Sequence, residues 1–459
     1  MKGWSGLLLA TLLVIYLPGL GHGFIKDDFV WIASNQLTRP ADLVTPFLQA
    51  PDFYRPLVQL SFAADWWLFG TEPLAYGLTN LAFLLAAAAV LGSLAVELGM
   101  TRGSALVAAA LWSLSFHGIN MALLWMSGRT ALLATLFALL AARAFVRGRT
   151  SRAAAWALLA MLSREDAVLL PFVLLAWGAL PSPTAAGDPD AGRIDPWRGA
   201  RRAWPLFAVL AVYLAARAAA GGMTPWTAPS FYRFTLDPAT VGRNVLEYLD
   251  RAATLPVAAT LIMALAARTL PRPTTRLWRQ VALGAVWMIG GYALAIVLPV
   301  RSSLYAVGPA AGAALAGAAL LASIWSRATP AARRRMVGTA ALVAVLAVPV
   351  HWSRNDRWVQ LARLSTHVLD EIAPVVARLP ADRVVRLDDD RGVRANLDAA
   401  FGTLIEAAVR VRTGMSRRVW IEPPVTDWQA GGLVAPDAED VAARFALRDG
   451  VLVRIETGP

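Results

Sequence analysis

The sequence predicts an all-α polytopic membrane protein with about eleven transmembrane helices, followed by a small soluble α+β domain. Of the 459 residues, 57% are hydrophobic and only 16% are charged. Apolar runs of about twenty residues, the length needed to cross a bilayer, recur along the chain. The arginines gather in short links between these runs. Together these observations indicate a bundle of membrane helices.

Eleven apolar segments are predicted to be membrane spans, of which the fifth and sixth are short. They cover residues 4–21, 74–97, 103–123, 128–146, 152–163, 165–180, 203–220, 252–268, 280–299, 303–325 and 336–351. The first span follows Met1-Lys2 and resembles a signal peptide. It has no small-residue cleavage site before Phe24, so we expect it to be retained.

The arginine-rich links set the predicted orientation. If Lys2 is cytoplasmic, the links within 143–152, 193–202, 268–279 and 327–335 all fall on the cytoplasmic side, as the positive-inside rule requires. The carboxyl terminus then lies outside, and we expect a multi-pass protein of a bacterial inner membrane. The net charge of +12 follows from this topology, so membrane lipids are expected partners and nucleic acid is not.

The first outer loop, residues 22–73, begins with two adjacent carboxylates, Asp27 and Asp28, just after the first span. Ionisable groups beside a membrane are costly and are typical of functional sites. An alternative is that they only cap a short helix or keep the loop in water. The same loop contains Tyr54-Arg55, and its aromatic stretch 62–69 predicts a helix in the interface.

Three more polar groups are predicted to lie on the same side of the membrane. They are His117, Asn120, Trp125 and Arg129 around the third turn, Ser163 to Asp166 between the short spans, and Arg301 with Tyr305 at the tenth span. The chain has no cysteine, which excludes disulfides and thiolate metal sites.

From residue 352 to 459 the pattern is that of a small outer domain. Apolar residues recur at helical spacing over 358–379, and short strands are predicted at 384–385 and 419–421. Residues 445–447 and 451–453 predict a hairpin through Asp449-Gly450. Asp388-Asp389-Asp390 looks like a nucleotide-sugar motif in isolation, but in so small a domain we expect a solvated turn.

The ordered motifs resemble those of GT-C membrane glycosyltransferases, and of protein O-mannosyltransferases of the tetratricopeptide-associated type in particular. They are the acidic pair, YRPL, SFAADWWLFG, YGLTNLAFLL, LLWMSGRTALLATLFALL and LSREDAVLLPF, with a weaker match at VRSSLYAVGPAAG. The first six cover roughly residues 5–180. Two features differ: His117-Gly118-Ile119-Asn120-Met121 lacks the family's glutamate, and no tetratricopeptide repeat follows.

The resemblance implies inverting transfer of a sugar, mannose in the named family, from a polyprenyl-phosphate donor to an outer protein, lipid or glycan acceptor. It implies a first-loop acid as general base, with Asp27 ranked before Asp28. Donor phosphate is assigned to Arg301 with Tyr305, and to Arg129 and Arg55, because guanidinium binds phosphate in a forked geometry. Tyr54, His117, Asn120, Trp125 and Glu165 are assigned to substrate binding, Arg164 is read as an internal partner of Glu165 and Asp166, and a divalent metal is left open.

Two other functions fit parts of the pattern. A transporter or lipid flippase would place charges or broken helices at the midplane and show inverted repeats, and neither is clear in the sequence. An inactive scaffold that presents the carboxyl-terminal domain to a partner would account for the missing glutamate.

Overall fold

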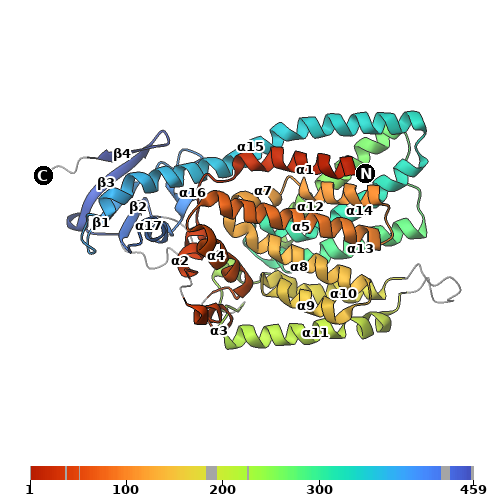
Figure 1. Cartoon of the computed structure of the whole chain (residues 1–459), viewed down its shortest axis with the longest axis horizontal. Coiled ribbons are helices and arrows are strands. Elements are labelled where there is room, and N and C mark those ends of the chain that lie inside the picture. The colour runs from red at the N-terminus through yellow and green to blue at the C-terminus, as the bar shows by residue number, and fades with distance from the viewer. Residues whose placement is uncertain are drawn as a thin grey trace.

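The computed structural model describes residues 2–36, 39–50, 52–181, 194–224, 227–424 and 435–455. Arg193, part of the second basic link, lies outside these ranges. Helices occupy all eleven predicted span positions, and they form the bundle in Figure 1. They are α1 (Lys2–Tyr16), α5 (Pro73–Glu97), α6 (Arg102–Ser113), α8 (Arg129–Val146), α9 (Thr150–Met161), α10 (Leu170–Ala179), α11 (Pro196–Ala219), α12 (Pro238–Ala267), α13 (Thr275–Tyr292), α14 (Val307–Arg327) and α15 (Pro330–Val376).

Within the described residues, seven segments are long and apolar enough to cross a membrane. They correspond to α5, α8 and α11 to α15. The apolar part of α1, Ser5–Gly19, is shorter, as are α6, α9 and α10. A helix of 12 residues such as α6 is only about 18 Å long at 1.5 Å per residue. The expected span over 103–123 is divided because the chain turns after Ser113, and Gly118 takes a positive φ of 90° before α7 (Ile119–Leu124).

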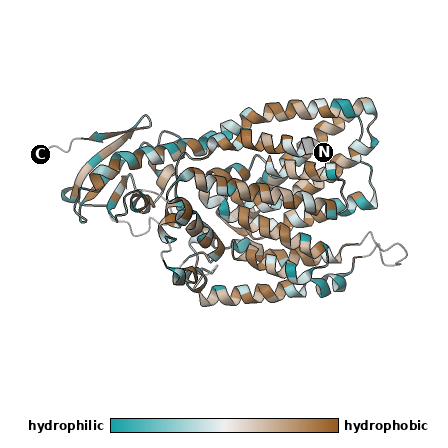
Figure 2. Ribbon diagram, viewed as in Figure 1, coloured by the Kyte–Doolittle hydropathy of each residue, from teal (hydrophilic) through white to brown (hydrophobic). Residues whose placement is uncertain are grey.

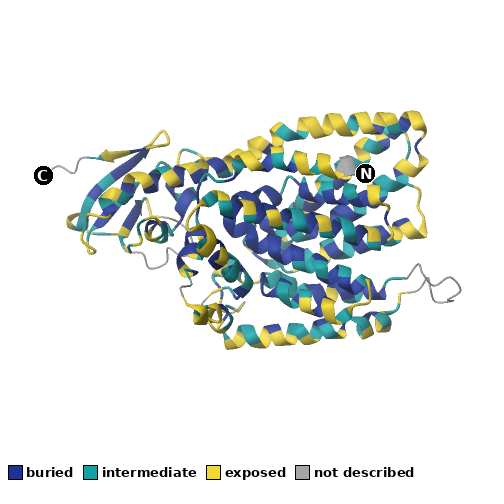
Figure 3. Cartoon of the chain, in the orientation of Figure 1, coloured by how far each residue is buried: buried dark blue, intermediate teal, exposed yellow. Residues whose placement is uncertain are grey.

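The outer helices expose their apolar side chains, as a protein surrounded by lipid does. Leu265, Val345 and Ile289 are 77%, 68% and 64% exposed. The hydrophobic colouring of α11 and α15 coincides with exposed surface in Figures 2 and 3. In water such a surface would be a strong aggregation liability. The chain is therefore a membrane protein.

Small residues let the inner helices pack closely. The backbones of α13 and α14 meet at Gly284 and Gly312, where an added Cβ on either glycine would collide with the carbonyl oxygen of the other. Close approach of this kind is typical of helix pairs in membranes. Around it, the buried core is rich in alanine and leucine.

The carboxyl-terminal domain has a four-stranded sheet with the order β2-β1-β3-β4. The strands are β1 (Val384–Asp388), β2 (Arg418–Glu422), β3 (Val441–Arg448) and β4 (Val451–Ile455), with helices α16 (Leu397–Phe401) and α17 (Ile405–Thr413). β1 is parallel to β2 and β3, whereas β3 and β4 form an antiparallel pair. The predicted strands, the hairpin and the α+β character are confirmed. Helix α15 runs unbroken across residue 352, the proposed start of this domain.

The first loop and the carboxyl-terminal domain share one hydrophobic core. The loop forms α2 (Asp27–Ser34), α3 (Thr45–Leu48) and α4 (Pro56–Phe69). Phe29 of α2 stacks on Phe401 of α16 at 6.0 Å, and the Lys26 amide donates to the Ala400 carbonyl at 2.9 Å. Both parts therefore lie at the same end of the bundle (Figure 1). The start of α2 is held by packing that the sequence pattern alone does not reveal.

Candidate active site

The two aspartates that begin α2 have different environments. Asp28 is fully buried, and its Oδ1 accepts hydrogen bonds from the Ser127 amide at 2.7 Å and the Ser127 hydroxyl at 2.5 Å. Its Oδ2 accepts from the Ile25 amide at 3.0 Å. Asp28 thus ties the first loop to the turn before α8, and a substrate cannot reach it without a rearrangement.

Burial raises the pKa of Asp28 to about 7, against the hydrogen bonds from Ser127 and Ile25, which lower it. The charge of Asp27 adds to the rise as the last of these causes. The rise falls on the buried member, and desolvation is its main cause.

This pKa predicts a pH-dependent stability. Between pH of about 4 and about 7, folded Asp28 keeps a proton that the unfolded chain has lost, so the free energy of unfolding falls as the pH rises through this window. A shift of about three units corresponds to at most roughly 4 kcal/mol. We expect the thermal midpoint of the wild type to fall relative to that of Asp28→Asn between pH 4 and 7, measured in detergent. A constant difference would contradict it.

Asp27 is exposed at the first position of α2. Burial raises the pKa of Tyr232, and the negative charge of Asp27 raises it further, so the two side chains lie within electrostatic reach. Tyr232 contacts Phe53 edge-on at 5.4 Å, and the Arg55 guanidinium lies 4.1 Å from the Phe53 ring centre. Asp27 is therefore the accessible carboxylate of the pair, close to the group around Arg55.

Arg55 and Glu165 form the centre of this group. The Arg55 Nε and Nη2 donate to the Glu165 carboxylate at 2.9 and 2.8 Å, and Arg217 Nη1 lies 3.6 Å from it. Burial would raise the pKa of Glu165, but the charge and hydrogen bonds of Arg55, with the charge of Arg217, hold it below its usual value. Glu165 is thus an ionised anchor that fixes two arginines.

Arg164 and Tyr305 lie beside this anchor. The Arg164 guanidinium is 4.8 Å from the Tyr305 ring centre, and its Nε is 3.2 Å from Asp166 Oδ2. Its Nη1 donates to the Leu304 carbonyl at 3.3 Å. Both Tyr232 and Tyr305 act electrostatically on Arg55, so residues from six separate segments converge. We call Asp27, Arg55, Arg164, Glu165, Arg217, Tyr232 and Tyr305 the outer cluster.

A narrow cavity of about 70 Å³ adjoins the outer cluster. Arg164 and Asp166 line it, together with small or apolar residues of α8, α10, α13 and α14, among them Ala134, Gly291 and Gly308. The lining therefore combines two charged side chains with mostly apolar ones.

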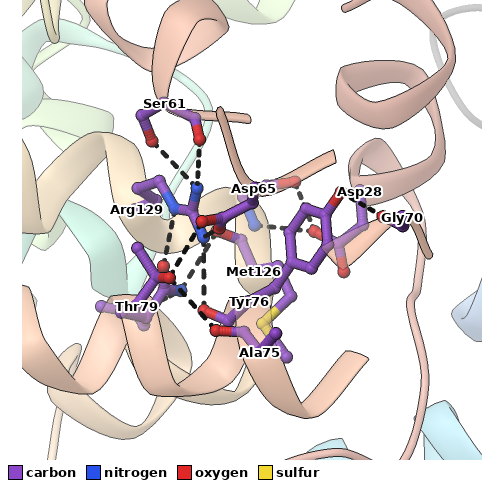
Figure 4. Close-up of polar contacts among 12 residues, drawn as sticks. Asp28, Ser61, Asp65, Gly70, Ala75, Tyr76, Thr79, Met126 and Arg129 are labelled. Atoms are coloured by element: carbon purple, nitrogen blue, oxygen red, sulfur yellow. Dashed lines mark hydrogen bonds and ion pairs between the residues drawn. The ribbon is translucent and has the colours of Figure 1, made fainter. Parts of the chain in front are cut away.

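Arg129, expected to bind phosphate, lies in a buried network instead (Figure 4). It has no exposed surface, and its Nη2 is 2.5 Å from Asp65 Oδ2. Its Nε donates to Asn80 at 2.8 Å and its Nη1 donates to the Ser61 hydroxyl at 2.9 Å. Since these groups saturate the guanidinium, we leave Arg129 out of the proposed site. Phe62, Ala63 and Asp65 of α4 are buried in the protein. Only part of the stretch 62–69 can therefore lie at the membrane interface.

Most other predicted site residues lie apart from the outer cluster. Arg301 forms an ion pair with Glu247 of α12. His117 lies 3.9 Å from Asp250 and 3.3 Å from Arg354, and burial, followed by the charge of Arg354, lowers its pKa.

Three further predicted residues have structural contacts. Asn120 donates to the Arg354 carbonyl at 3.5 Å, and Trp125 stacks on Trp358 at 6.1 Å. Tyr54 is buried and donates to the Phe47 carbonyl.

Asp388 and Asp389 are not in a solvated turn, which corrects that expectation. Asp388 pairs with Arg386 at 2.9 Å and with Arg444 at 2.6 Å. Asp389 accepts from the amides of Leu397 and Asp398 at the start of α16. The acidic run holds the small domain together.

The sequence does not mark Arg217 or Tyr232 as members of the outer cluster. It assigns Arg164 only to internal pairing with Glu165 and Asp166. Arg217 is a single arginine at the end of α11, and Tyr232 ends a single 3₁₀ turn, Ser230–Tyr232, so no spacing pattern marks either. Among the described residues, no group of three or more His, Asp or Glu side chains is arranged to hold a metal ion.

Comparison with solved structures identifies the architecture. Two crystal structures of ArnT from Cupriavidus metallidurans match this chain over 98% of its length. One, bound to undecaprenyl phosphate, has a TM-score of 0.51 and 15% identity over 94% of that chain. The other, in the apo state, has a TM-score of 0.52 and 16% identity over 93%. The arabinofuranosyltransferase AftD from Mycobacteria reaches a TM-score of 0.44, too low to establish a shared fold.

Neither family models nor curated protein sequences match the chain. At such low identity the likeness to ArnT concerns the fold alone. The expected GT-C-like architecture is confirmed: the chain has the ArnT-like fold, with a membrane bundle and a small carboxyl-terminal sheet domain.

Proposed function

We propose that this protein is a membrane glycosyltransferase that moves a sugar from a polyprenyl-phosphate donor to an acceptor on the outer side of the membrane. The observation that carries the proposal is the exposed Asp27 beside a cluster of three arginines at one end of the bundle. The ArnT fold supports it, since one ArnT structure is of a complex with undecaprenyl phosphate.

In this proposal Asp27 is the general base. Transfer with inversion needs one group to take the acceptor's proton while the phosphate leaves from the opposite face of the sugar. Asp27 is exposed, and Asp28 fixes the backbone from which it projects. Because Asp28 is buried and hydrogen-bonded, it acts as a positioning residue.

Arg164 with Tyr305 is the proposed phosphate site. Leaving-group charge is stabilised by cations held in place before the reaction. Arg164 adjoins the narrow apolar cavity, and a lipid phosphate needs charge and apolar surface side by side. Glu165 holds the guanidinium groups of Arg55 and Arg217 nearby. The proposal includes mannose as the sugar, after the family that the motifs resemble, and a protein, lipid or glycan as the acceptor. It also includes the orientation with a cytoplasmic amino terminus.

The test is a transfer assay on membranes with labelled polyprenyl-phosphate mannose. We expect label to enter an acceptor fraction only in membranes that contain the protein. Arg164→Gln should raise the donor KM by about tenfold or more, the loss of one charge-assisted hydrogen bond. Arg301→Gln should change it little, because Arg301 pairs with Glu247 and does not line the narrow cavity.

The other outcomes are equally informative. A raised KM in Arg301→Gln alone would place the phosphate at Arg301, as the sequence predicts. Movement of intact donor across the membrane without transfer would favour a flippase. No transfer from any polyprenyl-phosphate sugar tested would favour an inactive scaffold.

A further inference from the structure

A second cavity lies away from the outer cluster, between the first loop and the carboxyl-terminal domain. Its volume is about 360 Å³, within the range of roughly 300–1,000 Å³ that is typical of small-molecule sites. One wall is α2, through Val30, Ala33 and Ser34. The opposite wall is α17 and the segment that leads into β2, with Arg410, Arg417 and Arg418.

The wall from the carboxyl-terminal domain is strongly basic. Three arginines line the cavity together with a single acidic residue, Glu406, whose carboxylate already accepts a hydrogen bond from the Val419 amide at 3.3 Å. Some other arginines of this domain are paired with aspartates, as Arg412 is with Asp370. Arg410, Arg417 and Arg418 have no ion pair within the part of the chain that the structure describes.

Arg417 carries an unsatisfied donor. Its Nε is buried and has no hydrogen-bond partner among the described residues, while its Nη1 donates to the neighbouring Ser416 carbonyl at 3.1 Å. A buried donor without a partner is unfavourable, and an acceptor in the cavity would satisfy it. Guanidinium groups prefer the planar oxygens of carboxylate and phosphate.

We propose that the cavity between α2 and α17 binds an anionic group, a phosphate or carboxylate carried by a sugar-sized molecule or a lipid headgroup. The proposal does not depend on the transfer reaction. The apolar side of the cavity, Val30 and Ala33, would contact the uncharged part of the ligand. Because α2 begins at Asp27, the ligand would rest on the helix that carries the accessible aspartate.

The test uses the purified full-length chain in nanodiscs of neutral phosphatidylcholine, with glucose 6-phosphate as the probe and glucose as its neutral counterpart. We expect calorimetry to detect binding of glucose 6-phosphate but not of glucose. The double variant Arg410→Gln/Arg418→Gln should weaken binding roughly tenfold or more. Both side chains are exposed, so the thermal midpoint should stay unchanged. Arg448→Gln, at the exposed end of β3, is the matched control and should bind as the wild type does.

A second arm distinguishes the source of the anion. If phosphatidylglycerol nanodiscs raise the thermal midpoint of the wild type but not of the double variant, and glucose 6-phosphate does not bind, the ligand is a lipid headgroup. If neither probe distinguishes the wild type from the double variant, the proposal is overturned. Loss of binding in Arg448→Gln to the same extent would also overturn it, because general surface charge would then explain the effect.

Discussion

Replacement of Asp27 by asparagine is expected to reduce transfer by about 10²- to 10⁴-fold, the range for loss of a general base. Asparagine keeps the size of the side chain but cannot accept the acceptor's proton. Since the base acts in the transition state, kcat should fall while the donor KM changes little. The exposed position of Asp27 means that the thermal midpoint should remain close to that of the wild type. The measurement is initial transfer rate from labelled polyprenyl-phosphate mannose at several donor concentrations.

Two further aspartates sharpen this experiment. Asp52→Asn, on the exposed surface of the same loop, is the matched control and should keep full activity. Asp28→Asn should lower the thermal midpoint near pH 5 as well as the rate, because its three hydrogen bonds hold the loop. Full activity in Asp27→Asn would overturn its role as base, and activity lost only in Asp28→Asn without destabilisation would transfer that role to Asp28.

Replacement of Arg129 by methionine is expected to destabilise the protein by about 3–5 kcal/mol, the cost of leaving a buried ion-pair partner alone. Asp65, which is 4% exposed, would keep its charge, and among the described residues only the Thr79 hydroxyl would still donate to it, at 2.9 Å. Asn80 would also lose a partner while it still binds the Ala122 and Met126 carbonyls. We expect a lower yield of folded protein and a lower thermal midpoint in detergent.

The double variant Arg129→Met/Asp65→Leu is the control. Because it removes both charges, it should recover most of the lost stability. A phosphate-binding Arg129 would give the opposite pattern: the single variant would keep its thermal midpoint and raise the donor KM, and the Asp65 change would rescue neither. Thermal unfolding and donor KM measured on the same preparations therefore decide between the two roles.

Composition and periodicity determine the architecture, because membrane helices and short strands are local patterns. Long apolar runs predict α5, α8 and α14, and alternating residues around Asp449-Gly450 predict the hairpin. The boundaries fail where a tertiary contact decides them, as in α6, which stops at Ser113. The sequence predicts the small sheet domain, but it does not predict the packing of that domain against α2 through Phe29 and Phe401.

The sequence by itself predicts a membrane protein of this fold and marks a carboxylate pair and several arginines as candidates for its site. It could not determine which of them are accessible, because burial is a property of the packed chain. Asp27 and Asp28 are neighbours in sequence, yet helix geometry turns one outward and the other into hydrogen bonds with Ser127. In the same way Arg129 faces Asp65, and Arg164 faces Tyr305. Only the tertiary structure separates Arg129, whose guanidinium is saturated by buried partners, from Arg164, which lines a cavity and is the arginine that we propose for the phosphate.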